Sequence, residues 1–227
     1  MKPINSESFD SQVAFRIREM IRQGILLKGE KVKEIDLCHE LGVSRTPVRE
    51  ALRTLRSEGL IDLIPQKGAF VSEPPIEKIT EMLDVMALLE GEAARLTTDK
   101  LTTTELSKLE VMHDKLETHF QNNDIEKYLQ VNFVYHRLIQ EMAGNETLSN
   151  IIESLRDKIL LYRSKQLNIE GRFEASLQEH RDLLKAFQAK DADEAEEVMK
   201  RHLTRQCDAL VMLCLSSEEI SPEEMKK

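Results

Sequence analysis

Three histidines in the second half of the sequence lie where a helical chain can bring their imidazoles together. His136 follows Asn132 by four residues in "NFVYH", and this spacing places both side chains on one face of a helix. His180 in "LQEHRDLLKAF" and His202 in "MKRHLTRQ" fall on two later predicted helices that a short loop joins. These two helices should pack antiparallel, so the two imidazoles can face each other. Imidazoles that converge from three helices suit a divalent transition metal, and the sequence therefore predicts a metal site.

Other uses of these histidines remain open at this point. A histidine on an amphipathic helix is usually exposed or hydrogen-bonded, and we assign that ordinary role to His39, His113 and His119. Three histidines with an open coordination position also describe catalytic zinc, but no base motif such as HExxH accompanies them, so we do not expect an enzyme. A third interpretation is a helical bundle that only dimerises and binds no metal.

A second group of residues with chemical potential lies in "SRTPVREALRTLRSEGL", which starts at Ser44. Apolar residues recur there at helical spacing and predict a buried stripe, and the arginines take the opposite face. Arginine can pair bidentately with a phosphate or with guanine, and hydroxyl groups at the start of the helix can donate to phosphates. The alternative is a solvated face on which arginines pair with Glu50 and Glu58. The predicted DNA-contacting residues are Ser44, Arg45, Thr46, Arg49 and Arg53 on this helix, with Arg56 on the same face.

The elements around this arginine face predict a winged helix-turn-helix. We expect helices over residues 8–24 and 34–41, a tight turn at Gly42, and the arginine helix from Ser44, which should act as its N-cap. "LIDLIPQKGAFV" then predicts a strand, a turn and a strand, with Lys67 and Gly68 able to approach DNA from the turn. Pro74 and Pro75 end this part of the chain, so we predict a DNA-binding domain over residues 1–75.

The remainder of the chain, residues 76–227, predicts an all-helical antiparallel bundle. Apolar residues at helical spacing alternate with short polar breaks, as expected for bundle loops. The fold class is therefore mainly α, with the winged domain followed by the bundle. The predicted helices cover residues 76–97, 102–122, 125–143, 148–169, 172–189 and 192–216.

Composition supports an ordinary globular protein of the cytoplasm. The 227 residues are 41% hydrophobic and 32% charged, and no apolar run approaches the roughly 18 residues that span a bilayer. The three cysteines show no CxxC pairing, which favours reduced thiols. The net charge of −9 is uneven, because residues 1–75 hold 12 basic and 11 acidic residues whereas the remainder holds 20 and 30. The first domain is therefore nearly neutral as a whole, and its basic groups form a local cluster.

The stretch "LGVSRTPVREALRTLRSEGLIDLIPQKGAFV" resembles the DNA-binding domain of the GntR family of bacterial transcription regulators. The resemblance implies base and phosphate contacts from Arg45 and Arg49, assistance from Ser44 and Thr46, and Gly68 at the tip of the wing. Members of the family often carry a further polar or basic residue on the helix before the turn. This chain has Ile35 and Asp36 in that region.

The segments "NFVYHRLIQEMAGNETL" and "EHRDLLKAFQAKDADEAEEVMKRHL" resemble the all-helical FCD effector domain of the FadR-type branch of that family. With the first resemblance, this covers roughly residues 8–215. In that domain an aspartate and three histidines bind a metal, and the matching positions here are Asn132, His136, His180 and His202. Asn132 departs from the aspartate, and Met86 stands where relatives frequently carry an arginine. Arg163 is a candidate substitute partner for an anionic effector.

These observations together predict a sequence-specific, homodimeric DNA-binding transcription regulator. Its operator would be a double-stranded inverted repeat, since one recognition helix reads only a few base pairs. The helical domain would bind a divalent transition metal, with zinc or nickel as the first candidates, and a small organic acid as effector.

Overall fold

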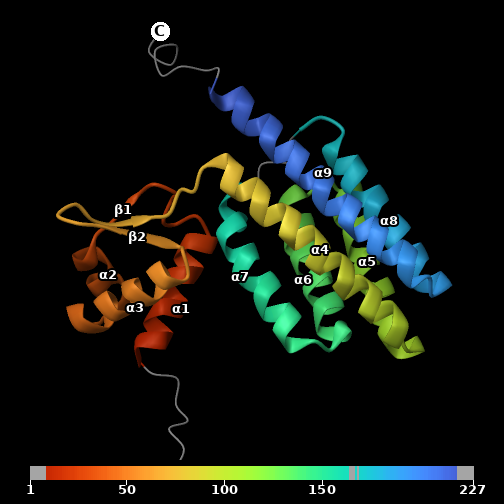
Figure 1. Ribbon diagram of the computed structural model, residues 1–227, viewed down its shortest axis with the longest axis horizontal. Helices are drawn as coiled ribbons and strands as arrows, with labels where there is room; N and C mark the ends of the chain where they lie inside the picture. Colours follow the sequence, from red (N-terminus) through yellow and green to blue (C-terminus); the bar gives the residue numbers. More distant parts are fainter. Residues whose placement is uncertain (1–8, 164–166, 168, 219–227) are drawn as a thin grey trace, which may run out of the picture. The chain divides into compact units, whose positions relative to one another are not determined.

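The computed structural model describes residues 9–163, 167 and 169–218 of the chain (Figure 1). The chain divides into two compact units, residues 1–75 and 76–227, which we describe one at a time. Among the described residues, no helix combines the length and the apolar character that a bilayer crossing requires. The mainly helical fold class predicted from the sequence is confirmed.

The first unit is a winged helix-turn-helix (Figure 1). Its three strands form an antiparallel sheet in the order β1-β3-β2, in which Ile64 pairs with Gly68 across the wing turn. Gly68 has φ +105°, a backbone conformation that favours glycine, so its place at the wing turn has a conformational reason. The elements are α1 (Phe9–Arg22), β1 (Lys31–Val32), α2 (Glu34–Leu41), α3 (Arg45–Ser57), β2 (Ile61–Ile64) and β3 (Gly68–Val71).

The turn between α2 and α3 sets the orientation of α3. Gly42 ends α2 with a left-handed backbone (φ 64°), and its N–H donates to the carbonyl of Cys38. Ser44 then occupies the N-cap position of α3 with extended backbone angles, as predicted, but its side chain makes no capping hydrogen bond. The predicted apolar stripe of α3 is buried at Val48, Ala51, Leu52 and Leu55, so the opposite face of the helix points to solvent.

The second unit is a bundle of helices (Figure 1). The long helices α4 and α9 lie side by side along much of their length, and α8 follows α9 closely. Thr102 starts α5 with a reciprocal capping box that involves Glu105, and the Asp124 side chain caps α6 at the N–H of Lys127. The helices are α4 (Ile76–Lys100), α5 (Thr103–Gln121), α6 (Ile125–Ala143), α7 (Glu146–Arg163), α8 (Arg172–Ala189) and α9 (Ala192–Glu218).

The bounds of α7 differ from the prediction. The helix begins at Glu146, two residues before the predicted start, because the side chain of Asn145 accepts a hydrogen bond from the N–H of Leu148 and caps it. The described helix extends to Arg163; the prediction continued to Ile169, but residues 164–166 and 168 lie outside the described residues, and Ile169 itself lies in a bend.

The bundle core explains the departure at residue 86. Met86 has no exposed surface and packs with large buried side chains that include Tyr128, Tyr135 and Phe187. An apolar residue therefore fills a position where relatives were expected to carry a cation. Any anion that binds in this bundle must find its positive partner elsewhere.

Candidate metal centre and nucleic-acid interface

The three histidines predicted to bind a metal meet in the core of the bundle. His136 from α6, His180 from α8 and His202 from α9 each offer one ring nitrogen, and these nitrogens all lie within 4.8 Å of one another. The three side chains are at most 3% exposed. Their ring centroids are separated by 5.5 Å (136 to 180), 5.3 Å (136 to 202) and 4.6 Å (180 to 202). The expectation that α8 and α9 bring their histidines face to face agrees with this arrangement.

Two of the histidines are oriented by buried carboxylates. His136 Nδ1 lies 2.6 Å from Oε2 of Glu90 on α4, and His202 Nδ1 lies 2.6 Å from Oε2 of Glu179 on α8. An ionised carboxylate only accepts hydrogen bonds, so each Nδ1 carries the proton and donates it. This leaves Nε2 as the nitrogen that each ring can offer to a metal, which is the usual support of metal-binding histidines.

His180 is oriented by the backbone of its own helix. Its Nδ1 donates to the carbonyl oxygen of Ser176, one turn earlier on α8, at 2.7 Å. Burial, reinforced by the neighbouring His202 and His136, holds the pKa of His180 well below its usual value. Burial also lowers the pKa of His202 to about 4, although its hydrogen bond to Glu179 acts in the opposite direction. Neutral imidazoles of this kind are the form that binds a metal.

Buried polar atoms without hydrogen-bond partners test whether a metal fits this centre. His180 Nε2 is such an atom, and so is Oδ1 of Asn132, which lies one turn before His136 on the same buried face of α6. The hydroxyl of Tyr135 is a third, and its ring centroid lies 5.6 Å from that of His180. Such groups are rare in folded proteins unless an ion, water or ligand satisfies them. The residues present therefore fit a divalent ion held by imidazole and amide ligands.

Gln206 is part of this centre and was missed from the sequence. It lies one turn after His202 on α9, is buried, and places its Nε2 2.5 Å from Nε2 of His202. The side chain thus covers the nitrogen that His202 would offer to a metal. The i, i+4 spacing in "HLTRQ" was the available signal, and it mirrors the spacing of Asn132 and His136 on α6.

Two buried arginines also escaped the sequence analysis. Arg156 on α7 donates from Nη2 to Oε1 of Glu90 at 2.6 Å, and its guanidinium lies over the ring of Phe133. Arg172, the first residue of α8, donates from Nη2 to Oε2 of Glu179 at 2.9 Å. In both arginines the Nε atom is buried without a hydrogen-bond partner. Each carboxylate that orients a histidine therefore has its negative charge balanced by a buried guanidinium.

The predicted effector residue, Arg163, cannot be placed relative to this centre. Arg163 is the last residue of α7, and its side chain lies outside the residues whose side chains the structure describes. Among the described side chains, Arg156 and Arg172 are the buried guanidinium groups that pair with the carboxylates of Glu90 and Glu179. A signal for them existed, because Arg156 continues the buried spacing of Ile152 and Ile159 along α7.

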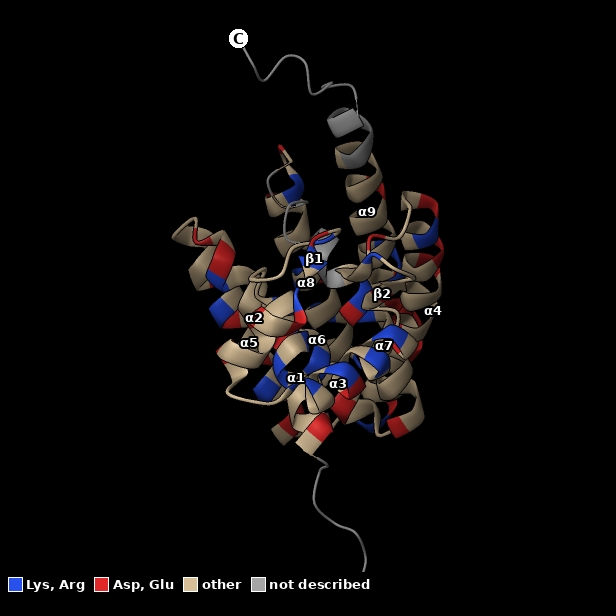
Figure 2. Cartoon of the chain, turned by 90° about the vertical axis from the view of Figure 1, so that its left-hand side faces the viewer, with Lys and Arg blue, Asp and Glu red and all other residues tan. Residues whose placement is uncertain are grey.

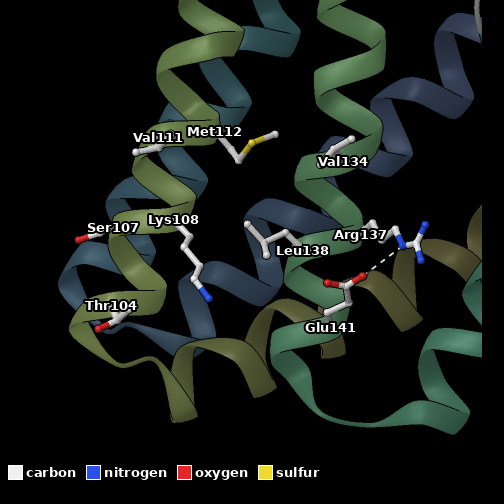
Figure 3. Close-up of a pocket in the computed structure, with 9 residues that line it drawn as sticks. All are labelled: Thr104, Ser107, Lys108, Val111, Met112, Val134, Arg137, Leu138 and Glu141. Atoms are coloured by element: carbon white, nitrogen blue, oxygen red, sulfur yellow. Dashed lines mark hydrogen bonds and ion pairs between the residues drawn. The ribbon is translucent and has the colours of Figure 1, made fainter.

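A separate groove runs between α5 and α6 (Figure 3). Its volume is about 560 Å³, and apolar side chains of both helices line it together with Lys108 and Arg137. Val134 and Leu138 face this groove, whereas Asn132 and His136 belong to the buried face of α6. The groove and the histidine centre therefore use different faces of one helix.

The arginine face of α3 is exposed as predicted from the apolar stripe. Figure 2 shows the lysine and arginine colour along α3. Two of its arginines have ion-pair partners: Arg49 Nε donates to Glu34 at 2.8 Å and Arg53 Nη1 donates to Glu50 at 2.7 Å. Glu58, the other acid considered as a partner for this face, pairs with Arg18 of α1 instead. The remaining predicted contact residues, which are Ser44, Arg45, Thr46, Lys67 and Gly68, are all exposed.

Comparison with known proteins gives two family matches that together span most of the chain. Residues 9–71 match the family described as "Bacterial regulatory proteins, gntR family", and residues 81–205 match the FCD domain. The second match contains all three histidines of the centre.

Individual relatives agree with these matches. The chain is 27% identical to the HTH-type transcriptional regulator YdhC of Bacillus subtilis, over 86% of this chain and 88% of that protein. It is 28% identical to the HTH-type transcriptional regulator McbR of Escherichia coli, over 82% and 85% of the two chains. The solved structure of E. coli McbR/YncC superposes with a TM-score of 0.78 at 24% identity and covers 91% of this chain and 98% of its own.

Proposed function

Because this chain belongs to the GntR family of bacterial regulatory proteins and carries the FCD domain, we propose that it is a metal-dependent, ligand-responsive regulator. The family makes it a DNA-binding transcription regulator and not an enzyme. Our proposal adds a divalent metal in the helical unit, a small organic acid as effector, and a homodimer in the cytoplasm that binds an inverted repeat.

The observation that supports the metal is the orientation of the three histidines. Each Nδ1 donates to an oxygen atom, two of them on buried carboxylates, and the three rings offer nitrogens within 4.8 Å of one another. Histidines with only structural roles would not be expected to donate from Nδ1 in all three rings and also to bring their remaining nitrogens together. When bound, a zinc or nickel ion would supply open coordination positions for an oxygen ligand. His136, His180 and His202 would hold it, with Asn132 as an additional oxygen donor.

The charge of the centre supports an anionic effector. Three neutral imidazoles and the Asn132 amide give the metal no negative charge, and Glu90 and Glu179 are already paired with buried arginines. A net positive charge buried in a medium of low dielectric constant favours an anion. A carboxylate would provide that charge, and the hydroxyl of Tyr135 is a donor without a partner in the same region.

DNA recognition supports the homodimer. A single recognition helix contacts only a few base pairs, and a two-fold dimer doubles these contacts on an inverted repeat. We assign the phosphate and base contacts to α3, with Arg45 and Arg49 as the main contributors, and further backbone contacts to the wing at Lys67 and Gly68.

The test uses full-length protein that was purified without a polyhistidine tag or a chelator. We expect about one transition-metal ion per chain by mass spectrometry, and a metal-dependent response of DNA binding to one of a panel of carboxylic acids by fluorescence anisotropy. His180→Ala should abolish stoichiometric metal, whereas His39→Ala, which changes an exposed histidine of the first unit, should leave it unchanged. A native protein without metal, and without thermal stabilisation by added zinc, would instead support a bundle that only dimerises.

A further inference from the structure

An ion pair joins the two helices of the helix-turn-helix. Glu34 is the first residue of α2, and its Oε2 accepts a hydrogen bond from Nε of Arg49 on α3 at 2.8 Å. The two residues are 15 positions apart in the sequence, so the pair is a tertiary contact between two helices. The Glu34 side chain is 34% exposed and that of Arg49 is 58% exposed, which leaves the arginine accessible to a partner.

This ion pair uses Nε of Arg49 and leaves terminal N–H donors of the guanidinium available for DNA. A guanidinium has five N–H donors in one plane, and Glu34 takes the one on Nε, at the inner end of the group. The pair of donors between the two terminal nitrogens lies at the far end of the group, and the hydrogen bond to Glu34 does not use it. A bidentate contact with O6 and N7 of guanine needs two such donors in a fixed plane. Glu34 therefore holds the plane of Arg49 without occupying the donors that a base would use.

The neighbouring pair on α3 has the opposite geometry and provides a contrast. Arg53 donates from a terminal nitrogen, Nη1, to Oε1 of Glu50, three residues earlier on the same helix. A base or phosphate would have to compete with Glu50 for that donor. Arg49 thus pairs with its glutamate through Nε, whereas Arg53 pairs with its glutamate through the terminal nitrogen Nη1.

We propose that Glu34 is a specificity-determining residue of the DNA interface that acts by positioning Arg49. A free arginine must lose rotamer entropy to adopt one geometry, and it can turn to any nearby phosphate. Glu34 limits both, because it fixes the plane of the group and its negative charge disfavours phosphates close to it. Glu34 should therefore lower the affinity for DNA in general and raise the discrimination at the base pair that Arg49 contacts. This inference rests on the proposed DNA contact of Arg49.

The experiment compares variants of the full-length protein on defined duplexes. A preferred operator is first selected with the wild type from a library of random duplexes. Binding is then measured by fluorescence anisotropy at several salt concentrations for that operator, for each of its single base-pair changes, and for an unrelated duplex. Arg49→Ala identifies the base pair at which Arg49 contributes to discrimination.

Three substitutions then separate geometry from charge. Glu34→Ala should reduce discrimination at the Arg49 base pair by about tenfold, the order of one bidentate contact, and should tighten binding to the unrelated duplex severalfold. Glu34→Gln keeps an oxygen that accepts from Nε but has no charge, so it should tighten binding to the unrelated duplex and preserve discrimination. Glu50→Ala removes an equal charge from the same surface, and it should also preserve discrimination at that base pair.

The outcomes distinguish this inference from the assignment on which it rests. If Arg49→Ala leaves discrimination intact at every position, the DNA contact of Arg49 is wrong and this inference falls with it. Suppose that Arg49→Ala reduces discrimination at one base pair, but that Glu34→Ala and Glu50→Ala change discrimination at that base pair equally. Glu34 then acts only through its charge, and the positioning role is overturned. Loss of discrimination in Glu34→Gln, with an unchanged melting temperature, would overturn it as well.

Discussion

Replacing Glu90 with glutamine tests the candidate metal centre most directly. Glu90 uses both carboxylate oxygens: Oε2 accepts from His136 Nδ1 and Oε1 accepts from Arg156 Nη2, each at 2.6 Å. The three side chains are 1%, 2% and 3% exposed for Glu90, His136 and Arg156, so water cannot substitute for a lost contact. The substitution keeps the shape of the side chain and changes only its charge and one acceptor.

A glutamine cannot satisfy both neighbours in their present form. Its amide has one accepting oxygen and one donating nitrogen, whereas His136 Nδ1 and Arg156 Nη2 are both donors. Since the guanidinium cannot lose its proton, the amide oxygen should stay with Arg156 and the amide nitrogen should face His136. The histidine must then shift its proton from Nδ1 to Nε2, and Nε2 can no longer bind a metal.

The size of both effects follows from the burial of the pair. Breaking a buried ion pair on one side costs about 3–5 kcal/mol of stability, because the remaining guanidinium is left without its counter-charge. Loss of the carboxylate behind a metal-binding histidine lowers metal affinity by about 10–100-fold. We expect Glu90→Gln to show both losses, by denaturant unfolding of the metal-free protein and by calorimetric titration with zinc.

Glu117→Gln is the matched control, since Glu117 also accepts hydrogen bonds at both carboxylate oxygens, in its case from Arg181 alone. Its contacts with Arg181 are both 2.6 Å, but the two side chains are 23% and 42% exposed. An exposed pair of this kind contributes about 0.2–1 kcal/mol, so the control should lose little stability and no zinc affinity. Zinc affinity of Glu90→Gln equal to that of the wild type would refute the orientation of His136 by Glu90.

Three further predictions concern Asn132, the arginines of α3 and the buried histidines. Asn132→Asp should tighten zinc binding and weaken binding of anionic effectors, because the new carboxylate supplies the missing negative charge; unchanged zinc affinity in calorimetry would remove residue 132 from the ligands. Arg45→Ala and Arg49→Ala should each weaken operator binding by about 1–3 kcal/mol with a steep salt dependence, and unchanged anisotropy titrations with an intact fold would refute the role of α3. The pKa values of His180 and His202 lie below the usual 6.5, so the unfolded chain binds protons that the folded chain does not. The unfolding free energy of the metal-free protein should therefore fall as the pH drops from 6.5 towards 4, and a flat profile in denaturant titrations would contradict this.

The fold could be predicted from the sequence because its local signals agree with one another. In α3, the spacing of Val48, Ala51 and Leu55 defines the buried side, and the position of every exposed arginine follows from it. Gly42 gives the tight turn before that helix, and its left-handed backbone is what a helix end of this type requires. The end of α7 was not predictable in this way, since residues up to 169 continue a helical composition without a stop signal.

The charged residues that support the histidines were missed because charges are normally assigned to the surface of a helix. Glu90 is the clearest example: it follows Met86 by four residues and precedes Ala94 by four, so it lies on the buried stripe of α4. Glu179 likewise lies on the buried side of α8, next to His180 and three residues after Ser176. A charged residue in register with an apolar stripe is the sequence signal for a buried pair, although its partner, which comes from another helix, cannot be identified without the tertiary structure.

The buried arginines offset the negative charge that Glu90 and Glu179 would otherwise provide near a metal. Glu90 and Glu179 fix the rings of His136 and His202, but their charges are already offset by two guanidinium groups, so they would orient the ligands of the proposed ion without neutralising it. In a centre with an aspartate at position 132, one ligand would itself carry a negative charge. Asn132 supplies none, and the pull of the metal on an external anion should be correspondingly stronger. The single change from carboxylate to amide at this position would thus make the centre depend on its effector for charge balance, and this dependence is the property that a ligand-responsive regulator needs.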